Sequence, residues 1–270
     1  MKNILVMTWF TLREAFARKV FLFFLGFSIL VIAALAIITG FADISLTDIH
    51  MRGNRMIGDD IITTFEMMIV NPLANLCLLL AIFSSASFVP VMLEKGNIDL
   101  LLSKPISRSQ LLWGKYFGGI LVVLLNIAFL ILGVWFIISL KFAHWNFAVL
   151  WAILLLTFTY AALNAVIILF GVITKSSIFG MMTAYFIYLI LSPLLLAAKD
   201  RMIPFLQNKV LNSILDGLYY IFPKTSELLG KDIFNLASGT NIEVQPILTS
   251  FLFLLLIMVL SVEIFKRKDF

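Results

Sequence analysis

Six stretches of the chain contain no Asp, Glu, Lys or Arg and consist almost entirely of apolar residues. A helix that crosses a membrane needs about 20 such residues in a row, because each residue adds about 1.5 Å along the helix axis. The strands of a membrane barrel alternate apolar and polar residues, a pattern that these stretches do not follow. We therefore expect six transmembrane helices, over residues 20–40, 67–93, 117–140, 146–173, 176–198 and 246–262.

The overall composition leads to the same class of protein. Of the 270 residues, 62% are hydrophobic and only 13% are charged, and the mean hydropathy is +1.07. Soluble domains average about 45–50% apolar and about 25% charged residues, which excludes a water-soluble globule. Disorder requires low hydrophobicity, so it is excluded as well. The predicted fold is one all-α polytopic membrane domain over residues 1–270.

Positive charge is distributed unevenly between the two predicted membrane faces. Twelve of the twenty Lys and Arg residues fall on the side of the N-terminus, together with five of the fifteen acidic residues. Because cytoplasmic loops carry an excess of Lys and Arg, both termini are predicted to be cytoplasmic. The segments expected on the outer side are 41–66, 141–145 and 199–245.

Residues 1–19 are predicted to form a helix on the inner membrane surface. Apolar residues fall on one side of this helix and charged residues on another, as in interfacial amphipathic helices. Glu14 and Arg18 are four residues apart, in the order that favours an ion pair within a helix. Trp9 and Arg13 complete the set assigned to this interface helix. The alternative is a solvated, charged lead-in to the first span.

The outer segment 199–245 has a helical pattern of its own. Pro204 can occupy the first turn of a helix, and apolar residues then recur at helical spacing up to Phe222. We expect this amphipathic helix to lie in the outer interface or to enter the membrane as a re-entrant piece covered by protein. A second, short helix is predicted from Pro223 to Gly230, with the glycine at its end.

The predicted spans contain little that could support chemistry. Cys77 is the only cysteine, and the two histidines, His50 and His144, lie outside the spans, so neither a disulfide nor a Cys/His metal site is expected. An intramembrane protease or an ion-coupled carrier would need ionisable residues inside the spans. Asn126 and Asn164 lie deepest among the polar residues, and they either bond neighbouring helices or line a transport path. We expect no enzyme activity, no bound cofactor and no nucleic-acid binding.

The inner loop 94–116, between spans two and three, is the most informative segment. Asn97 can cap one short amphipathic helix, and Ser107 can cap a second that leads into span three. An apolar run flanked by charged residues suits docking onto a cytoplasmic partner. An elbow that lies on the lipid surface is the alternative.

This loop resembles the signature of type-2 ABC-transporter permeases. It has a Glu at the end of span two, a Gly soon after, an acidic-leucine run, a Ser-x-Pro-x-Ser-Arg sequence, and Leu-Leu-x-Gly-Lys-x-x-Gly entering span three. Asn97 and Ile98 depart from the Gly-Thr-Leu that commonly follows. The resemblance implies that the loop couples the chain to an ATPase through Glu94, Gly96, Asp99, Leu101, Leu102, Pro105, Ser107, Arg108 and Lys115.

The resemblance also implies the partners and the location. Such permeases pair as homodimers or with a related permease in the prokaryotic cytoplasmic membrane, and each binds a cytoplasmic ABC ATPase that holds the ATP and magnesium. The chain has no GxxxxGK[ST] phosphate loop of its own. Its short outer loops and Pro223-Lys224-Thr225 are similar to the stand-alone permeases of nitrous-oxide-reductase maturation and gliding motility.

The expected function is that of a permease subunit, more specifically of an exporter that works by alternating access. Segment 199–245 could bind a partner on the outer face. Two alternatives from other classes are a membrane scaffold or immunity-type protein that transports nothing, and a passive channel. A channel would need charged or carbonyl-rich rings along a pore, which the sequence does not show. The sequence does not identify the substrate.

Overall fold

The computed structural model describes residues 2–17, 19–41, 55–94, 96–98, 103, 106–200, 209–238 and 243–268. All regular elements within these ranges are helices, without a strand. Six of the helical stretches are long and apolar enough to cross a membrane, which confirms the predicted all-α polytopic class. The six spans are α2 (Val20–Phe41), α4 (Arg55–Ser85) with α5 (Phe88–Met92), α7 (Arg108–Phe142), η1 (Phe147–Leu150) with α8 (Trp151–Thr174), α9 (Ser177–Phe186) with η2 (Ile187–Leu191) and α10 (Ser192–Lys199), and α14 (Val244–Arg267).

The fourth span, built mainly from α8, forms the centre of the bundle. In its apolar window 78% of the residues are buried inside the protein, against 17% for the first span. Helices α4, α7, α9 and α14 all pack against α8. Tyr160, Leu156 and Leu163 of α8 are fully buried in the main apolar core. The other spans therefore present most of their apolar surface to lipid and meet one another around α8.

The helices extend beyond the apolar runs from which the spans were predicted. Helix α7 has 35 residues, about 50 Å at 1.5 Å per residue, whereas the hydrocarbon core of a bilayer is about 30 Å thick. Lys115, which the sequence placed in the inner loop, lies two turns inside α7 and is buried. Glu66, which was expected in the outer loop, lies inside α4 and is 1% exposed. The predicted absence of ionisable residues thus holds for the middle of the spans but not for their ends.

Two spans that were predicted as continuous helices are interrupted. Span two is interrupted at Ala86 and Ser87, where α4 ends and the short α5 begins. Span five contains the π-helical turn η2, in which Tyr188 donates a hydrogen bond to the Asn75 side chain of α4. A single π-helical turn within a span is not visible in the hydropathy of the sequence.

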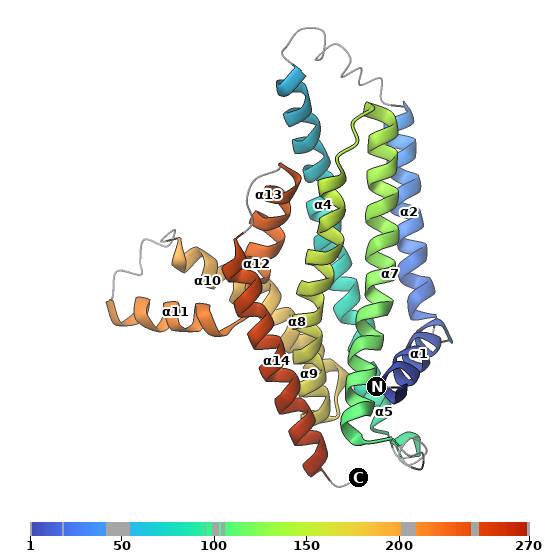
Figure 1. Ribbon diagram of the computed structural model, residues 1–270, viewed down its shortest axis with the longest axis vertical. Coiled ribbons are helices and arrows are strands. Elements are labelled where there is room, and N and C mark those ends of the chain that lie inside the picture. The colour runs from blue at the N-terminus through green and yellow to red at the C-terminus, as the bar shows by residue number, and fades with distance from the viewer. Residues whose placement is uncertain are drawn as a thin grey trace.

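The start of α1 (Lys2–Ala17), α5 and the end of α14 lie at the same end of the bundle (Figure 1). Helix α1 lies at an angle to the spans and packs mainly against the first turns of α7. The sharp turn from α1 into α2 is made by Lys19, a non-glycine residue with φ of 59°. We refer to this end of the bundle as the inner end, because the positive charge of the loops predicts that it faces the cytoplasm.

The segment after span five is helical, as predicted. Helix α11 (Lys209–Ile221) lies across the direction of the spans (Figure 1), which fits an interfacial or re-entrant helix. Pro204, its predicted start, lies outside the described residues. The second helix does not end at Gly230: α12 (Thr225–Glu227), the π-helical η3 (Leu228–Asp232) and α13 (Ile233–Ala237) follow one another directly. Helix α13 packs against both α8 and η1, and the side-chain amide of Asn146, the N-cap of η1, donates to the Ala237 carbonyl at 3.0 Å.

The arrangement predicts which residues can be labelled from each side of the membrane. Ala143→Cys, in the turn after α7, and Arg267→Cys, at the end of α14, are both exposed and lie at opposite ends of the bundle. In a Cys77→Ala background, a membrane-impermeant thiol reagent added to intact cells should label Ala143→Cys, and Arg267→Cys only after lysis. The opposite pattern would reverse the predicted orientation, and labelling of both sites in intact cells would contradict the six-span topology.

Candidate functional site

Helix α1 lies unusually close to the first turns of α7. Gly114 and Gly118 are four residues apart on α7, and a Cβ atom at either one would collide with Met7 or Thr11 of α1. Met7, Thr11 and Ala15 follow the same spacing along α1 and are all buried. Small residues at this spacing let two helix backbones approach each other within a membrane protein. The two helices are therefore expected to move together.

An ion pair reinforces this contact. The Lys115 ammonium group meets the Glu14 carboxylate, and the two side chains are only 2% and 17% exposed. Asn3 donates a hydrogen bond of 3.1 Å to the Gln110 side chain, one turn nearer the start of α7. The sequence also predicts a pair between Glu14 and Arg18, which lies outside the described residues, so that pair stays a prediction. The prediction followed spacing within one helix and missed the partner across the helix contact.

The opposite side of α1 is apolar and exposed. Leu5, Trp9 and Phe16 all lie on this surface, and the Arg13 guanidinium group lies over the Trp9 ring at 5.5 Å from its centre. Cation–π contacts of this type keep a charge close to an apolar surface. The structure thus fits a helix that rests on the membrane surface, with Trp9 and Arg13 on its exposed side.

The predicted ATPase-coupling residues are divided between exposed and packed positions. Glu94, Gly96 and Ser107 are exposed at the inner end, and Gly96 adopts a φ of +92° that only glycine tolerates easily. Lys115 is buried against α1, so it cannot touch a partner directly. Four of the predicted residues of the loop lie outside the described ones, namely Asp99, Leu101, Leu102 and Pro105.

Ser107 caps α7 rather than a separate short helix. Its hydroxyl accepts from the Gln110 N–H, and the Gln110 side chain accepts from the Ser107 N–H, which completes a capping box. The predicted cap is correct, but the helix it starts runs through the membrane without a break. The first predicted helix of the loop, starting at Asn97, lies mostly outside the described residues. Arg108, the first residue of α7, donates to the Lys266 carbonyl of α14 at 3.1 Å.

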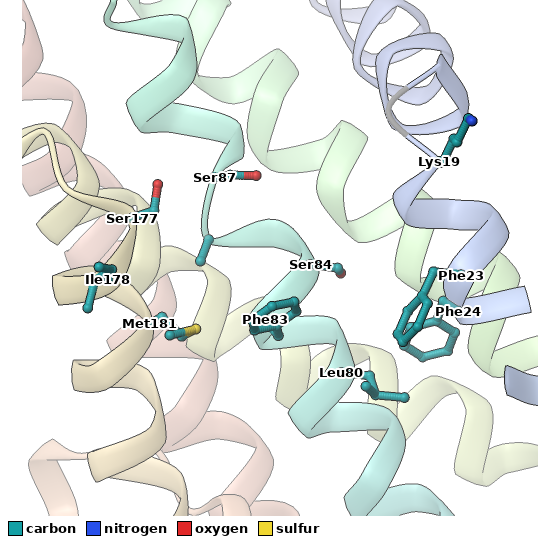
Figure 2. Close-up of a pocket in the computed structure, with 11 residues that line it drawn as sticks. Lys19, Phe23, Phe24, Leu80, Phe83, Ser84, Ser87, Ser177, Ile178 and Met181 are labelled. Atoms are coloured by element: carbon teal, nitrogen blue, oxygen red, sulfur yellow. The ribbon is translucent and has the colours of Figure 1, made fainter.

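A lateral pocket of about 430 Å³ lies near the inner end, between α2, α4 and α9. Figure 2 shows Phe23 and Phe24 of α2 on one side, Phe83 of α4 in the middle, and Met181 of α9 on the other side. Polar groups are confined to a few positions, namely Lys19, Ser84, Ser87 and Ser177. The pocket is half open and could receive an amphiphilic molecule, but a single chain does not enclose it.

The two asparagines proposed for a transport path lie elsewhere. Asn126 is 1% exposed and Asn164 is 2% exposed, both inside the contact between α7 and α8. The Asn126 amide donates to the Val122 carbonyl of its own helix at 3.0 Å. Neither residue lines the pocket between α2, α4 and α9. Their positions favour a role in helix packing within one chain.

A second polar cluster lies in the outer segment. Glu227, 3% exposed, accepts from Tyr219 at 2.6 Å and from Lys199 at 3.0 Å, which ties α10, α11 and α12 together. The buried Lys224 ammonium group lies 4.0 Å from the centre of the Tyr219 ring, and burial lowers its pKa. Burial also raises the pKa of Asp232 from 3.8 to about 6. Buried charges of this kind fix the relative positions of short helices that have little apolar surface.

The sequence reasoning missed several residues at the inner end. Lys19 and Lys175 both adopt a positive φ, 59° and 54°, at the turns that lead into α2 and α9. From the sequence, the positive charge of these two residues predicts only the orientation of the chain in the membrane. Non-glycine residues in this conformation have no reliable sequence signal and depend on the packing around them.

Comparison with known families identifies the architecture. The family model described as ABC-2 family transporter protein matches residues 13–270, which is nearly the whole chain. Among curated proteins, no sequence matches the chain. The family match takes in the α1–α7 contact from Arg13 onward, the inner loop and all six spans.

The buried ion pair between α1 and α7 makes a testable contribution to stability. Lys115→Met removes the buried ammonium group that meets the Glu14 carboxylate, and removing one partner of a buried ion pair is destabilising, by up to about 3–5 kcal/mol. The matched double variant Glu14→Gln, Lys115→Met removes both charges and should recover most of this loss. The measurement is thermal unfolding of the purified protein in detergent. Equal destabilisation in the single and double variants would show that the pair does not hold the helices together.

The raised pKa of Asp232 predicts a pH dependence with a definite sign. The folded state holds this proton up to about pH 6, whereas the unfolded chain releases it near 3.8. Stability therefore decreases as the pH rises between these two values. Asp232→Asn should remove that part of the decrease and unfold at a higher temperature than the wild type above pH 6. Parallel pH profiles for the two proteins would contradict the prediction.

Proposed function

We propose that the chain works as an exporter driven by a separate cytoplasmic ATPase. The basis is that the chain belongs to the ABC-2 transporter family and is the membrane permease component of an ABC transporter. ATP and magnesium are bound by that ATPase and not by this chain. The chain itself changes shape and catalyses no reaction. This proposal places both termini in the cytoplasm of a prokaryotic cell, on the side of α1 and the inner loop.

The observation that carries the proposal is the assembly at the inner end. Glu94 and Gly96 are exposed just ahead of α7, while Lys115 and the two glycines, Gly114 and Gly118, fix α1 to the same helix. A partner that pushes on the loop therefore displaces α7 and α1 together. Transport then follows from the different contacts that the ATPase makes in its nucleotide-bound and nucleotide-free states.

The pocket between α2, α4 and α9 is the proposed transport path. It opens sideways, so a second copy that faces it would complete the enclosure and produce a dimeric pathway. Its aromatic and aliphatic lining suits an amphiphilic substrate with a substantial apolar part. Ser87 and Ser177 could meet the polar part near the inner end.

The finer placement within the family rests on the outer segment. Its short connections and Pro223-Lys224-Thr225 are similar to the stand-alone permeases of nitrous-oxide-reductase maturation and gliding motility, and we propose this subgroup. Lys224 and Thr225 are buried at the joint between α11 and α12, so they shape the segment from inside. The exposed part of 199–245 is the proposed surface for a partner on the outer face.

Co-purification tests the proposed coupling. The full chain, expressed in its native host, should retain an ABC ATPase after solubilisation in mild detergent. Glu94→Arg reverses an exposed charge in the loop and should reduce the captured ATPase by about tenfold, as expected for a residue at the centre of an interface. The matched control is Glu263→Arg, an exposed reversal on α14 at the same end. Wild-type protein without any ATPase, or equal capture by both variants, would contradict the proposal.

A further inference from the structure

The ends of three spans are joined at the inner end by two basic side chains. Arg108 begins α7, and its Nη1 atom donates to the carbonyl groups of Phe265 at 3.4 Å, Lys266 at 3.1 Å and Lys268, where α14 ends. Lys268, the residue that follows α14, donates from Nζ to the carbonyl groups of Val172 at 2.7 Å and Ile173 at 2.8 Å. These last two carbonyls belong to the final turn of α8.

The helix directions explain why these contacts are favourable. The last four carbonyl groups of a helix have no partner within it, and the partial negative charge there attracts cations. Helices α8 and α14 both end where α7 begins, so two C-termini meet one N-terminus. An arginine at the first position of α7 is unfavourable for the dipole of its own helix. The hydrogen bonds from its guanidinium group to the carbonyl groups at the end of α14 offset that cost and connect α7 to α14.

The neighbouring contacts extend this connection into one body. Helix α1 is fixed to α7 by the Glu14–Lys115 pair and the close approach at the glycines. The short helix α5 packs against α8, where Pro90 lies in ordinary contact with the position of Gly171. We use the term inner plate for α1, α5 and the inner ends of α7, α8 and α14.

Each of the three helices that line the pocket meets the inner plate at a turn. Helix α2 follows α1 at Lys19, α9 follows α8 at Lys175, and α4 meets α5 at Ala86 and Ser87. Lys19, Ala86 and Ser87 themselves line the pocket, and Ser177 lies two residues beyond Lys175. Any displacement of the plate therefore reaches the pocket walls at their inner ends.

We propose that Arg108 and Lys268 are positioning residues that make α14 and α8 move with the coupling end of α7, so that the C-terminal tail is part of the transmission path. This proposal rests on the proposed function and adds to it. Without the two contacts, only apolar packing would connect α7 to α8 and α14 at this end, so a push on the loop would displace α8, and through Lys175 the pocket helix α9, less than it displaces α7 and α1. ATP hydrolysis would then continue without the matching change at the pocket.

The test measures nucleotide-dependent distances in the complex with the co-purified ATPase. Spin labels are placed at Ile29 on α2 and Met182 on α9, both exposed, in a Cys77→Ala background and diluted into unlabelled permease. A second pair, Phe117 on α7 and Leu260 on α14, reports on the plate itself. In the wild type the first distance should change when ATP is trapped, and the second should stay constant.

The variants separate transmission from simple stability. Lys268→Gln should hydrolyse ATP at close to the wild-type rate but show a change between α2 and α9 that is about threefold smaller, and Arg108→Gln should show the same smaller change. The distance between α7 and α14 should become dependent on nucleotide in Arg108→Gln. Lys268→Arg keeps a cationic donor and should restore the response, and the control Arg267→Gln, with a side chain 79% exposed, should behave as wild type.

The possible failures are distinct. A wild-type complex without any nucleotide-dependent change between α2 and α9 would overturn the proposed function, and the transmission path with it. A normal change in both Gln variants would overturn the transmission path alone. If the Gln variants do not fold, the test uses the wild-type protein labelled at Phe117 and Leu260. A nucleotide-dependent change in the distance between α7 and α14 as large as that between α2 and α9 would show that the inner plate is not one body.

Discussion

The contact between α1 and α7 determines how the rest of the inner end is arranged. Two glycines let the helix backbones approach, and the approach removes Lys115 from water, so the lysine needs Glu14 at that point. A buried ion pair adds little net stability but penalises any other arrangement of the two helices, because a separated charge would be left in an apolar site. The pair therefore acts mainly on specificity, and it fixes one register of α1 against the start of α7.

The same physical rule explains where ionisable groups occur in the described spans. Lys115, in the second turn of α7, and Lys199, at the end of α10, each pair with a carboxylate, and Glu66 lies four residues inside the second apolar stretch, Ile62–Met92. A charge at the middle of a bilayer is costly and is normally kept only for a function performed there. A force applied at one end of a helix bundle is transmitted by rigid connections at that end and does not require charged groups at the middle. The inner plate of α1, α5, α7, α8 and α14 provides such connections.

Hydropathy and capping rules predicted much of this fold from the sequence, because both act locally. The six spans, the cap at Ser107 and the amphipathic α11 follow from residue order alone. The partner of Glu14 depends on a contact between residues far apart in the sequence, and Lys175 occupies the left-handed C-cap of α8, where glycine is the usual residue, so neither follows from these rules. Arg108 shows the limit clearly: its motif marked it as important, but only the position of the α14 C-terminus reveals what it touches.

The strained turns at Lys19 and Lys175 add a final constraint on how the pocket can open. A non-glycine residue with positive φ costs about 1–3 kcal/mol and persists only where its surroundings enforce it. Both turns lie between the plate and a pocket helix, so a displacement of the plate can relieve or increase that strain. Glycine at either site would adopt both backbone states easily and would allow the helices to move independently. The left-handed state costs lysine free energy, so each turn keeps this conformation only while the packing around it enforces it.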